Sequence, residues 1–386
     1  MKKLVIVTAT RAEYGLLAPI IKKLQKNDNV EVRLAVTGAH LSPEFGMTVK
    51  EIEADGIAID KKIEILMSSD TPVGISKSMG LAIISFAEYF AESKPDALMV
   101  LGDRYETLAV CCAALNNRTP IIHLYGGEAT LGAIDEAIRN AITKLSFLHF
   151  TSTESYRQRV IQMGEAPERV FCVGAIGVEN AQNVKLLSKK NLETEIGFSL
   201  GKKYAVLTFH PVTLEDNTAE KQTKELLQAI IKFPDIDFLC TKANADTDGR
   251  IINELIGQYA QKYPNIHLVD SLGAKRYLSA VCYSEFVIGN SSSGIVEVPS
   301  FKIPTVNVGD RQLGRIQASS VINCEPLEDS IIKAIKKAMS NDFKDKLKDM
   351  INPYGNGNTT SKITSITENY LNNDKILLKK KFFDLL

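Results

Sequence analysis

Four carboxylates in one short stretch of the chain are the side chains best suited to acid–base chemistry. Asp103 follows an apolar run, Glu128 closes a Gly-Gly-Glu sequence, and Asp135 and Glu136 stand four and three residues before Arg139. Each acid lies just past an apolar run typical of a buried strand, or at the start of a helix. Acids at the carboxyl ends of parallel strands face the crevice where α/β proteins bind ligands. Because clustered carboxyl groups can hold protons unequally, this stretch is the expected location of the reaction.

Local helix-capping roles compete with this interpretation. Asp103 can cap the helix that follows it, with Glu106 completing a capping box three residues later, and spacing alone favours the cap. Asp135 can likewise be a cap, and Glu136 and Arg139 can form an i, i+3 pair on a solvated helix face. A capping role and a catalytic role are compatible, so both remain open for these acids.

A small-residue turn predicts a second kind of site, one for phosphate. The sequence Gly-Asn-Ser-Ser-Ser-Gly spans 289–294, between an apolar run and a helical segment. Such a turn leaves backbone N–H groups bare at the positive end of a helix, where phosphate binds. The hydroxyls of Ser291, Ser292 and Ser293 can add hydrogen bonds, and Glu297 can accept from ribose hydroxyls. The alternative is an ordinary N-capped turn; the absence of Walker and G-x-G-x-x-G patterns argues against a nucleoside triphosphatase or a dehydrogenase.

Two further residues follow apolar strand-like runs. Arg11 lies in the first strand-to-helix turn, where its guanidinium could pair with a diphosphate or, alternatively, with Glu13 at the surface. His210 follows a strand-like run and precedes Pro211, although a lone histidine is more often structural. No His and Cys pair has metal-ligand spacing, so no tight metal site is expected.

The elements that must position these residues form two series of alternating strands and helices. The strands of the first series are expected at 4–10, 30–37, 97–102, 119–124, 148–152 and 170–173, and those of the second at 204–209, 237–240, 266–269, 285–288 and 304–308. Leu17, Ile20, Ile21 and Leu24 have the spacing of one buried helix face. Alternation of this kind predicts an α/β fold with parallel sheets covered on both faces, here two Rossmann-like domains facing a cleft.

The expected domain boundaries follow polar and breaker sequences. A polar stretch near 179–195 is interpreted as the interdomain connection, which separates a first domain at 1–178 from a second at 179–358. A Pro-, Gly- and Asn-rich breaker at 352–358 precedes a helix with Ile363, Ile366, Tyr370 and Leu371 on one side. The remainder, 359–386, ends in a basic and apolar tail, which is interpreted as docked rather than as a membrane anchor.

Composition restricts the class of protein and its partners. Lysine plus arginine equals aspartate plus glutamate at 46 each, so no global field favours nucleic acid or a membrane surface. No apolar run approaches the roughly 18 residues of a membrane span, and the short apolar start does not resemble a signal peptide. The six cysteines are interpreted as small buried hydrophobes in a reducing cytoplasm.

In chain order, these motifs resemble those of the UDP-N-acetylglucosamine 2-epimerases. The motifs that carry the resemblance are Thr-Arg-Ala-Glu-Tyr-Gly at 10–15, Gly-Asp-Arg at 102–104, the block from Gly-Gly-Glu128 to Arg139, Phe-His-Pro-Val-Thr at 209–213, Gly-Asn-Ser-Ser at 289–292, the segment 308–315 and the breaker at 352–357. The Gly-Gly-Glu block with Ile-Thr-Lys-Leu-Ser at 142–146 is similar to the hydrolysing branch, which serves the synthesis of sialic acid and related nonulosonic acids.

The resemblance implies a fold and a reaction. The fold is of the glycosyltransferase-B type, with the segment 359–386 forming a C-terminal helix that crosses back to the first domain. The reaction converts UDP-N-acetylglucosamine and water to N-acetylmannosamine and UDP without a redox cofactor or a metal. A homo-oligomer, a dimer or a tetramer, is expected, and the expected partner is a sugar nucleotide, a UDP-sugar or a GDP-sugar.

The resemblance also assigns residues. Asp103 and Asp135 are the first candidates for proton transfer, with Glu128 and Glu136 lining the same catalytic site. The substrate-binding residues are Arg11, Arg104, His210, Asn244, Ser291, Ser292, Glu297 and Arg311, of which Glu297 would hold the ribose.

One residue departs from the family pattern. Many members carry a functionally important glutamate two residues after the His123 position, and this chain has Tyr125 there. Either another acid, first Glu128, takes that role, or the substrate differs, as in relatives that act on a GDP-linked or a 2,4-diacetamido sugar. Three competing functions also stay open: a non-hydrolysing epimerase, a glycosyltransferase of the same fold and a non-catalytic sugar-nucleotide sensor.

Overall fold

The computed structural model describes residues 1–67, 69, 71–131, 134–212, 218–243, 249–270, 272–372 and 378–385. The chain divides into two compact units. Unit 1 consists of Met1–Glu128, Asp135–Glu179 and Gly355–Leu386, and unit 2 consists of Ala129–Ile134 and Asn180–Tyr354. The short segment Ala129–Ile134 differs from the sequence expectation, because the N–H of Leu131 donates to the carbonyl of Leu313 at 3.1 Å, within unit 2.

Unit 1 is built on a seven-stranded sheet whose strand pairs are all parallel. Its strands are β1 (Lys2–Thr8), β2 (Val30–Thr37), β3 (Ile59–Ile63), β4 (Ala97–Leu101), β5 (Ile121–Leu124), β6 (Leu148–Thr151) and β7 (Val170–Cys172). Their order is β3-β2-β1-β4-β5-β6-β7, so the winding direction reverses between β1 and β4. Ligands of doubly wound sheets bind at this switch point, beyond the carboxyl ends of the strands.

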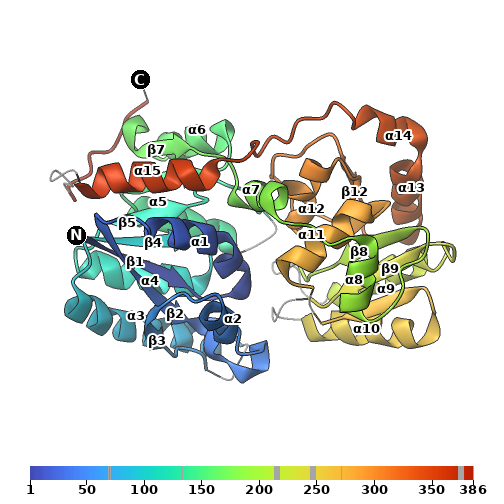
Figure 1. Ribbon diagram of the computed structural model, residues 1–386, viewed down its shortest axis with the longest axis horizontal. Coiled ribbons are helices and arrows are strands. Elements are labelled where there is room, and N and C mark those ends of the chain that lie inside the picture. The colour runs from blue at the N-terminus through green and yellow to red at the C-terminus, as the bar shows by residue number, and fades with distance from the viewer. Residues whose placement is uncertain are drawn as a thin grey trace. The chain divides into compact units, whose positions relative to one another are not determined.

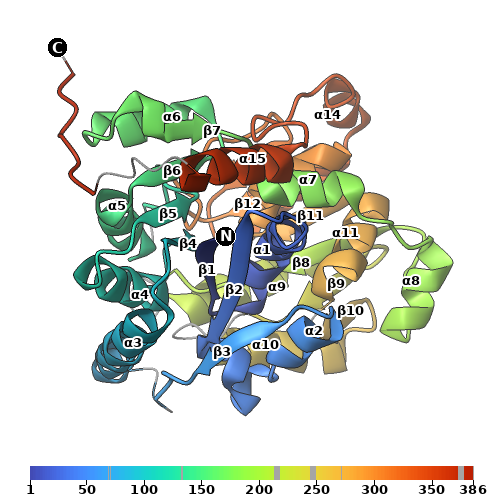
Figure 2. The same cartoon turned by 60° about the vertical axis from the view of Figure 1, so that its left-hand side comes forward.

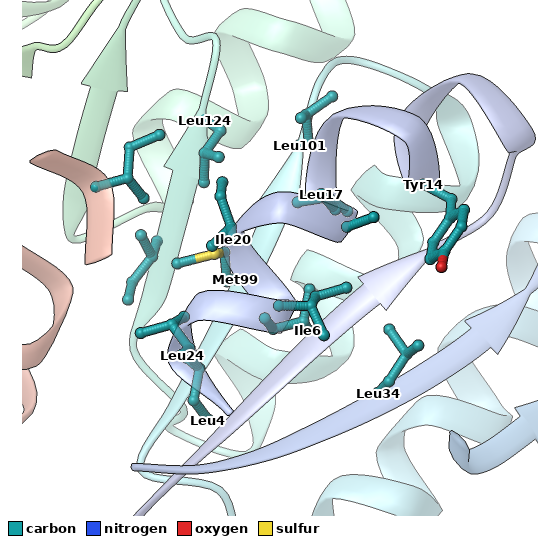
Figure 3. Packing of buried hydrophobic residues seen from close by; sticks show 14 of the residues in the cluster. Leu4, Ile6, Tyr14, Leu17, Ile20, Leu24, Leu34, Met99, Leu101 and Leu124 are labelled. Atoms are coloured by element: carbon teal, nitrogen blue, oxygen red, sulfur yellow. The ribbon is translucent and has the colours of Figure 1, made fainter. Parts of the chain in front are cut away.

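Helices cover both faces of this sheet (Figure 1). One face packs against α1 (Arg11–Leu24), α2 (Val49–Ala54) and α15 (Thr359–Asn372), and the other against α3 (Pro72–Ser93), α4 (Tyr105–Asn116) and α5 (Asp135–Leu145). Residues alternate along β1: Leu4 and Ile6 join the first core, while Val5 and Val7 join the second. Figure 3 shows Leu17, Ile20 and Leu24 of α1 packed over the first face, as their spacing predicts.

The remaining elements of unit 1 are short. They are the helices α6 (Glu154–Gln162) and α7 (Ile176–Asn183), within which the unit boundary falls, and the 3₁₀ turns η1 (Gly38–Leu41), η2 (Pro43–Phe45) and η3 (Pro167–Arg169).

Unit 2 repeats the plan with a six-stranded parallel sheet in the order β10-β9-β8-β11-β12-β13. The strands are β8 (Tyr204–Thr208), β9 (Asp237–Thr241), β10 (Ile266–Val269), β11 (Phe286–Gly289), β12 (Thr305–Val308) and β13 (Val321–Cys324). The helices are α8 (Lys189–Ile196), α9 (Ala219–Ile230), α10 (Gly249–Lys262), α11 (Gly273–Tyr283), α12 (Ser293–Val296), α13 (Glu328–Met339) and α14 (Asn341–Lys346), with the 3₁₀ turn η4 (Val298–Phe301). The predicted pair of parallel α/β sheets is therefore confirmed.

The sequence pattern missed two strands, β3 and β13, and both lie at sheet edges. The three central residues of β3, Asp60, Lys61 and Lys62, are exposed, so this strand lacks the apolar run by which the others were identified. Charged residues are typical of edge strands because they discourage pairing with a further strand.

The polar segments differ in part from expectation. The stretch interpreted as a connection, 179–195, is largely helical and forms much of α7 and α8. The helix predicted after the breaker is α15, with Ile363 and Leu371 buried, and the described part of the tail is docked on unit 1, as expected. The interpretation of the six cysteines as buried hydrophobes holds for Cys111 and Cys240, whereas Cys112, Cys282 and Cys324 are half-buried and Cys172 is exposed. Within the described residues no helix has the length and apolarity needed to cross a membrane.

Gly289 lies where the ends of β11 and β8 in unit 2 approach each other closely. Its φ is +131°, and a Cβ atom there would lie 1.9 Å from the carbonyl oxygen of Thr208. We therefore expect Gly289→Ala to lower the free energy of unfolding by about 3 kcal/mol or more. In the matched control Gly257→Ala, within α10, the new Cβ meets nothing closer than 3.8 Å, so stability should stay constant or rise by up to about 1 kcal/mol. Urea denaturation measures both, and equal stability of the two variants would contradict the prediction.

Candidate functional site

The side chain of Arg139 forms hydrogen bonds to residues of each acidic motif of unit 1. Its Nη1 donates to the backbone carbonyl of Glu128 at 2.9 Å and to the Glu136 carboxylate at 2.7 Å, while Nη2 donates to Asp103. The Arg139 side chain is 1% exposed, whereas the side chains of Asp103 and Glu136 are 26% and 24% exposed. A guanidinium offers five N–H donors in a fixed fork, which suits it to hold several oxygen acceptors at once. Three motifs that are separate in sequence therefore meet at one buried cation.

The capping interpretation of Asp103 is wrong. The N-cap of α4 is Arg104, whose side chain makes no capping hydrogen bond, and the Asp103 carboxylate is directed to Arg139 instead. Glu106 is buried and accepts from Nε of Arg104 at 3.2 Å. The expected Glu136–Arg139 pair forms, but not on a solvated face, because Arg139 is buried. A buried cation supplied by a distant helix competes successfully for carboxylates that local spacing would assign to a cap.

The Gly-Gly-Glu turn places Glu128 in a buried position. The Glu128 carboxylate accepts from the Ser152 hydroxyl at 2.8 Å. Gly127 has a φ of +77°, and a Cβ there would lie 2.4 Å from the backbone oxygen of Tyr156, so only glycine allows α6 to pack this closely. Asp135 is the first residue of α5 and is half-buried.

His123 connects the Asp103 turn to β5 and α5. Its Nε2 lies 2.8 Å from the carbonyl oxygen of Gly102, and its Nδ1 lies 3.3 Å from the hydroxyl of Thr143. Burial lowers the pKa of His123 to about 3, so the imidazole is neutral at physiological pH. Because a carbonyl can only accept, the proton belongs on Nε2, and Nδ1 accepts from Thr143.

Tyr125 has a structural contact at the position where the family pattern has a glutamate. Its φ is +72°, and its hydroxyl accepts from the N–H of Ile176 at 2.8 Å. Ile176 begins α7, so the phenol satisfies one of the N–H groups that a helix leaves unpaired at its start.

The first strand-to-helix turn holds a buried carboxyl group. Glu13 accepts from the N–H groups of Ala9 at 2.8 Å and Thr10 at 3.2 Å, and the Thr10 hydroxyl accepts from the Glu13 N–H, which forms a complete capping box. Arg11 donates to Glu51 at 2.9 Å, so the Arg11–Glu13 pair considered from sequence is replaced by another. Burial raises the pKa of Glu13 to about 7, and the nearby Glu106 contributes to that increase.

In unit 2, Asn290 connects the ends of β8 and β11. Its Oδ1 accepts from the N–H of His210 at 2.7 Å and its Nδ2 donates to the His210 carbonyl at 2.8 Å. Arg311 Nη1 and Gln312 Nε2 donate to the carbonyl of Asn290, at 3.2 and 2.8 Å. His210 is buried, and burial together with Arg311 lowers its pKa to about 3. His210, Arg311 and the serine turn therefore lie together at the switch point of this sheet.

The serine turn leaves polar groups accessible. Ser292 is exposed and makes no side-chain capping bond, while the Ser291 hydroxyl accepts from the N–H of Ser293 at 3.4 Å. Glu297 directly follows α12 and is half-buried. Asn244, a predicted substrate-binding residue, lies outside the described residues. Hydroxyls and the guanidinium of Arg311 form a polar set of the kind that binds an anion.

Three residues of these clusters were not singled out by sequence reasoning. Arg139 was noted only as the partner of Glu136, and Glu13 only as a surface partner of Arg11. His123 serves there only as the reference position for Tyr125. Their common property is burial of a polar group, which depends on packing and has no local sequence signal.

A double-mutant cycle tests whether Arg139 and Asp103 act as a pair. We expect Arg139→Met to lower the free energy of unfolding by roughly 3 kcal/mol, because partly buried carboxylates lose their cation. In the Asp103→Asn background the cost should be smaller by about 1–2 kcal/mol. The control is the same cycle on the exposed pair Lys346 and Asp342, where coupling should be negligible. Additive costs for Arg139 and Asp103 in urea denaturation would refute the pairing.

The raised pKa of Glu13 makes the stability of the protein depend on pH. Because its pKa is about 7 in the folded protein and about 4.5 in the unfolded chain, the folded state binds the extra proton between these values. Stability contributed by this group is therefore lost as pH rises. We expect the unfolding free energy of Glu13→Gln, relative to the original protein, to improve by about 2 kcal/mol between pH 5 and pH 8. A difference that does not change with pH would show that Glu13 does not titrate in this range.

Comparison with known proteins identifies the family. Residues 22–368 match the family model described as UDP-N-acetylglucosamine 2-epimerase. The chain is 43% identical to the GDP/UDP-N,N'-diacetylbacillosamine 2-epimerase (hydrolyzing) of Campylobacter jejuni, over 100% of this chain and 99% of that protein. It is 40% identical to polysialic acid biosynthesis protein P7 of Escherichia coli, over 100% of this chain and 98% of that protein.

The fold is also that of a solved member of this family. The crystal structure of UDP-GlcNAc 2-epimerase from Neisseria meningitidis, bound to UDP-GlcNAc, superposes with a TM-score of 0.81 at 20% identity, covering 95% of this chain and 99% of that one. With the family model matching most of its length, the chain belongs to the UDP-N-acetylglucosamine 2-epimerase family.

Proposed function

We propose that this protein is a hydrolysing sugar-nucleotide 2-epimerase, which converts a nucleoside-diphosphate 2-acetamido sugar and water to the free 2-epimeric sugar and the nucleoside diphosphate. The observation that carries the proposal is the convergence of Asp103, Glu136 and the Glu128 turn on Arg139. Further support comes from two relatives: one at 43% identity is named as a hydrolysing 2-epimerase, and one at 40% as a polysialic acid biosynthesis protein.

The chemistry explains why several acids are needed. The C2 proton of the sugar is not acidic, because no carbonyl adjoins C2. A base can remove it only as the C1–O bond to the diphosphate breaks, which gives an unsaturated 2-acetamidoglucal and the nucleoside diphosphate. Water then adds at C1 while a proton returns to C2 on the opposite face. Overall one water is consumed and one diphosphate is released. The two proton transfers need carboxyl groups in different protonation states.

Residue roles in this scheme are proposed from the resemblance to the family. Asp103 and Asp135 are proposed to transfer protons, and Glu128 and Glu136 to line the same site. Arg139 holds Asp103, which follows β4, beside Glu136 of its own helix α5.

A second set of residues is proposed to bind the nucleotide part of the substrate. Hydrogen bonds and cations on the departing diphosphate lower the barrier to C1–O cleavage. This role is proposed for Arg11, Arg104, His210, Ser291, Ser292 and Arg311, with Glu297 on the ribose and Asn244 as a further substrate contact.

UDP-N-acetylglucosamine is the first proposed substrate, with N-acetylmannosamine as the product. The second candidate is a UDP- or GDP-linked 2,4-diacetamido sugar. It is favoured by the name of the relative at 43% identity and by Tyr125, whose hydroxyl is engaged with Ile176.

A product assay in deuterated water tests the function. Purified protein is incubated separately with UDP-N-acetylglucosamine and with UDP- and GDP-linked diacetamido sugars, without an acceptor. We expect release of the free 2-epimeric sugar with deuterium at C2, together with the nucleoside diphosphate. A nucleotide-linked epimer without released diphosphate would indicate a non-hydrolysing epimerase. Turnover only after addition of an acceptor would indicate a glycosyltransferase, and binding without turnover would indicate a sensor.

Asp103→Asn tests the proton-transfer role. The amide keeps the shape of the side chain but cannot exchange a proton, so kcat should fall by about 10²-fold or more. Binding of the nucleoside diphosphate, measured by calorimetry, should change little. Asp342→Asn, on the exposed face of α14, is the control and should keep full activity. Retention of more than half of kcat in Asp103→Asn would exclude Asp103 as a proton-transfer group.

A further inference from the structure

The C-terminal tail, residues 378–385, places the ammonium group of Lys380 in a polar site at the carboxyl end of α5. Lys380 Nζ lies 2.8 Å from the carbonyl oxygens of Lys144 and Ser146, and 2.8 Å from both carboxylate oxygens of Glu165. An ammonium group has three N–H donors, and here they face two carbonyls and one carboxylate. In Figure 2 the tail is the terminal red segment near α5.

The tail is also fixed on the C-terminal side of this contact. The N–H of Phe383 donates to the carbonyl of Gly164 at 2.9 Å, and the Phe382 ring lies 5.1 Å from Nζ of Lys144. A Cβ on Gly164 would lie 2.3 Å from that ring, so the glycine leaves the space that Phe382 occupies. The tail is therefore seated by backbone, aromatic and ionic contacts together.

The chemistry of a helix end explains why a cation is suited to this place. The last carbonyls of an α-helix have no partner within the helix and carry its negative dipole end. Glu165 adds a full negative charge, since its carboxylate stays ionised although the side chain is completely buried. Burial alone would raise its pKa, but hydrogen bonds from His149, Lys144 and Lys380 outweigh burial and lower it to about 2.

Further buried polar side chains lie between Glu165 and the acid cluster. Glu165 lies 3.1 Å from Nε2 of His149, which is also fully buried. His149 pairs in register with His123 across β6 and β5. His123 in turn contacts Thr143 of α5 and the carbonyl of Gly102, next to Asp103. Buried polar groups on adjacent strands thus lie between Lys380 and the turn that carries Asp103, although no hydrogen bond joins the two imidazoles, because Nδ1 of His149 has no partner among the described residues.

The composition of α5 gives these polar contacts a large share in holding the helix. Only Arg139, Ile142 and Thr143 of its eleven residues are buried, so a single apolar side chain of this helix is fully buried in the core. Ile138 and Leu145 add half-buried apolar contacts to the same core, so α5 takes its position from a small apolar face together with the polar contacts at its two ends. Arg139 supplies the contact near the acids. At the opposite end Lys380 acts together with Lys144, whose Nζ donates to Glu165 at 2.7 Å and to the carbonyl of Met163 at 2.9 Å.

We propose that Lys380 is a positioning residue, with the C-terminal tail acting as a strap that fixes α5 and thereby the Asp135, Glu136 and Arg139 side chains it carries. The kinetic consequence rests on the function proposed above, but the mechanical role of the strap does not.

The test compares Lys380→Met, which removes the charge at similar length, with Lys380→Arg, which keeps it. Lys381→Met, at the exposed neighbouring residue, is the matched control. Hydrogen–deuterium exchange of the amides of α5 reports on the strap. We expect exchange about tenfold faster in Lys380→Met, with kcat lower by about tenfold or more, because small displacements of catalytic groups cost large factors in rate. KM and UDP affinity should stay within about twofold, and Lys381→Met should match the original protein.

Chemical rescue keeps the test independent of misfolding. In Lys380→Ala, added propylammonium should restore slow exchange in α5 and part of kcat, whereas tetramethylammonium, which has no N–H donor, should not.

Each outcome decides the inference. Unchanged exchange in Lys380→Met, or equal recovery with both ammonium ions, would overturn the strap. Faster exchange with unchanged kcat would overturn the positioning role and leave a purely stabilising contact. If the original protein turns over no sugar nucleotide, the proposed function fails, and exchange with its rescue alone decides on the strap.

Discussion

The buried guanidinium of Arg139 is the interaction on which the acidic site of unit 1 depends. Asp103 follows β4, Glu128 follows β5 and Glu136 lies on α5, so three elements present oxygen atoms to one cation. Burial of a charge is costly unless it is paired, and here the pairing partners are the groups proposed to do the chemistry. The same ion pairs therefore determine both the arrangement of the acids and part of the stability of the fold.

Unit 2 achieves a comparable result with the amide side chain of Asn290 at its centre. Asn290 exchanges two hydrogen bonds with the backbone of His210, and Arg311 and Gln312 hold its carbonyl. The close approach of β11 to β8 at Gly289 makes this possible, because no side chain stands between the strand ends. The polar junction of unit 2 lies at its switch point, the place where doubly wound folds bind ligands, and that of unit 1 lies beside its switch point, beyond the ends of β4 and β5.

Where sequence reasoning failed, a partner distant in sequence had replaced a local one. Asp103 and Glu106 have capping-box spacing, but Asp103 binds Arg139, 36 residues away. Arg11 binds Glu51 rather than Glu13, because Glu13 is occupied in its own capping box and is buried. The edge strand β3 was missed for a related reason: edge residues are selected for solubility, and their pattern lacks the apolar alternation of a central strand.

The sequence by itself determined the class of fold, most of the strands, the buried face of α1, the helix α15 and the motifs that identify the family. These properties depend on the order of apolar and polar residues along the chain, which is a local quantity. Only the tertiary structure decided that Arg139 is buried among the acids, that Tyr125 holds the start of α7, and that Lys380 closes the end of α5. These depend on which residues packing brings together and removes from water, and no spacing within one segment contains that information.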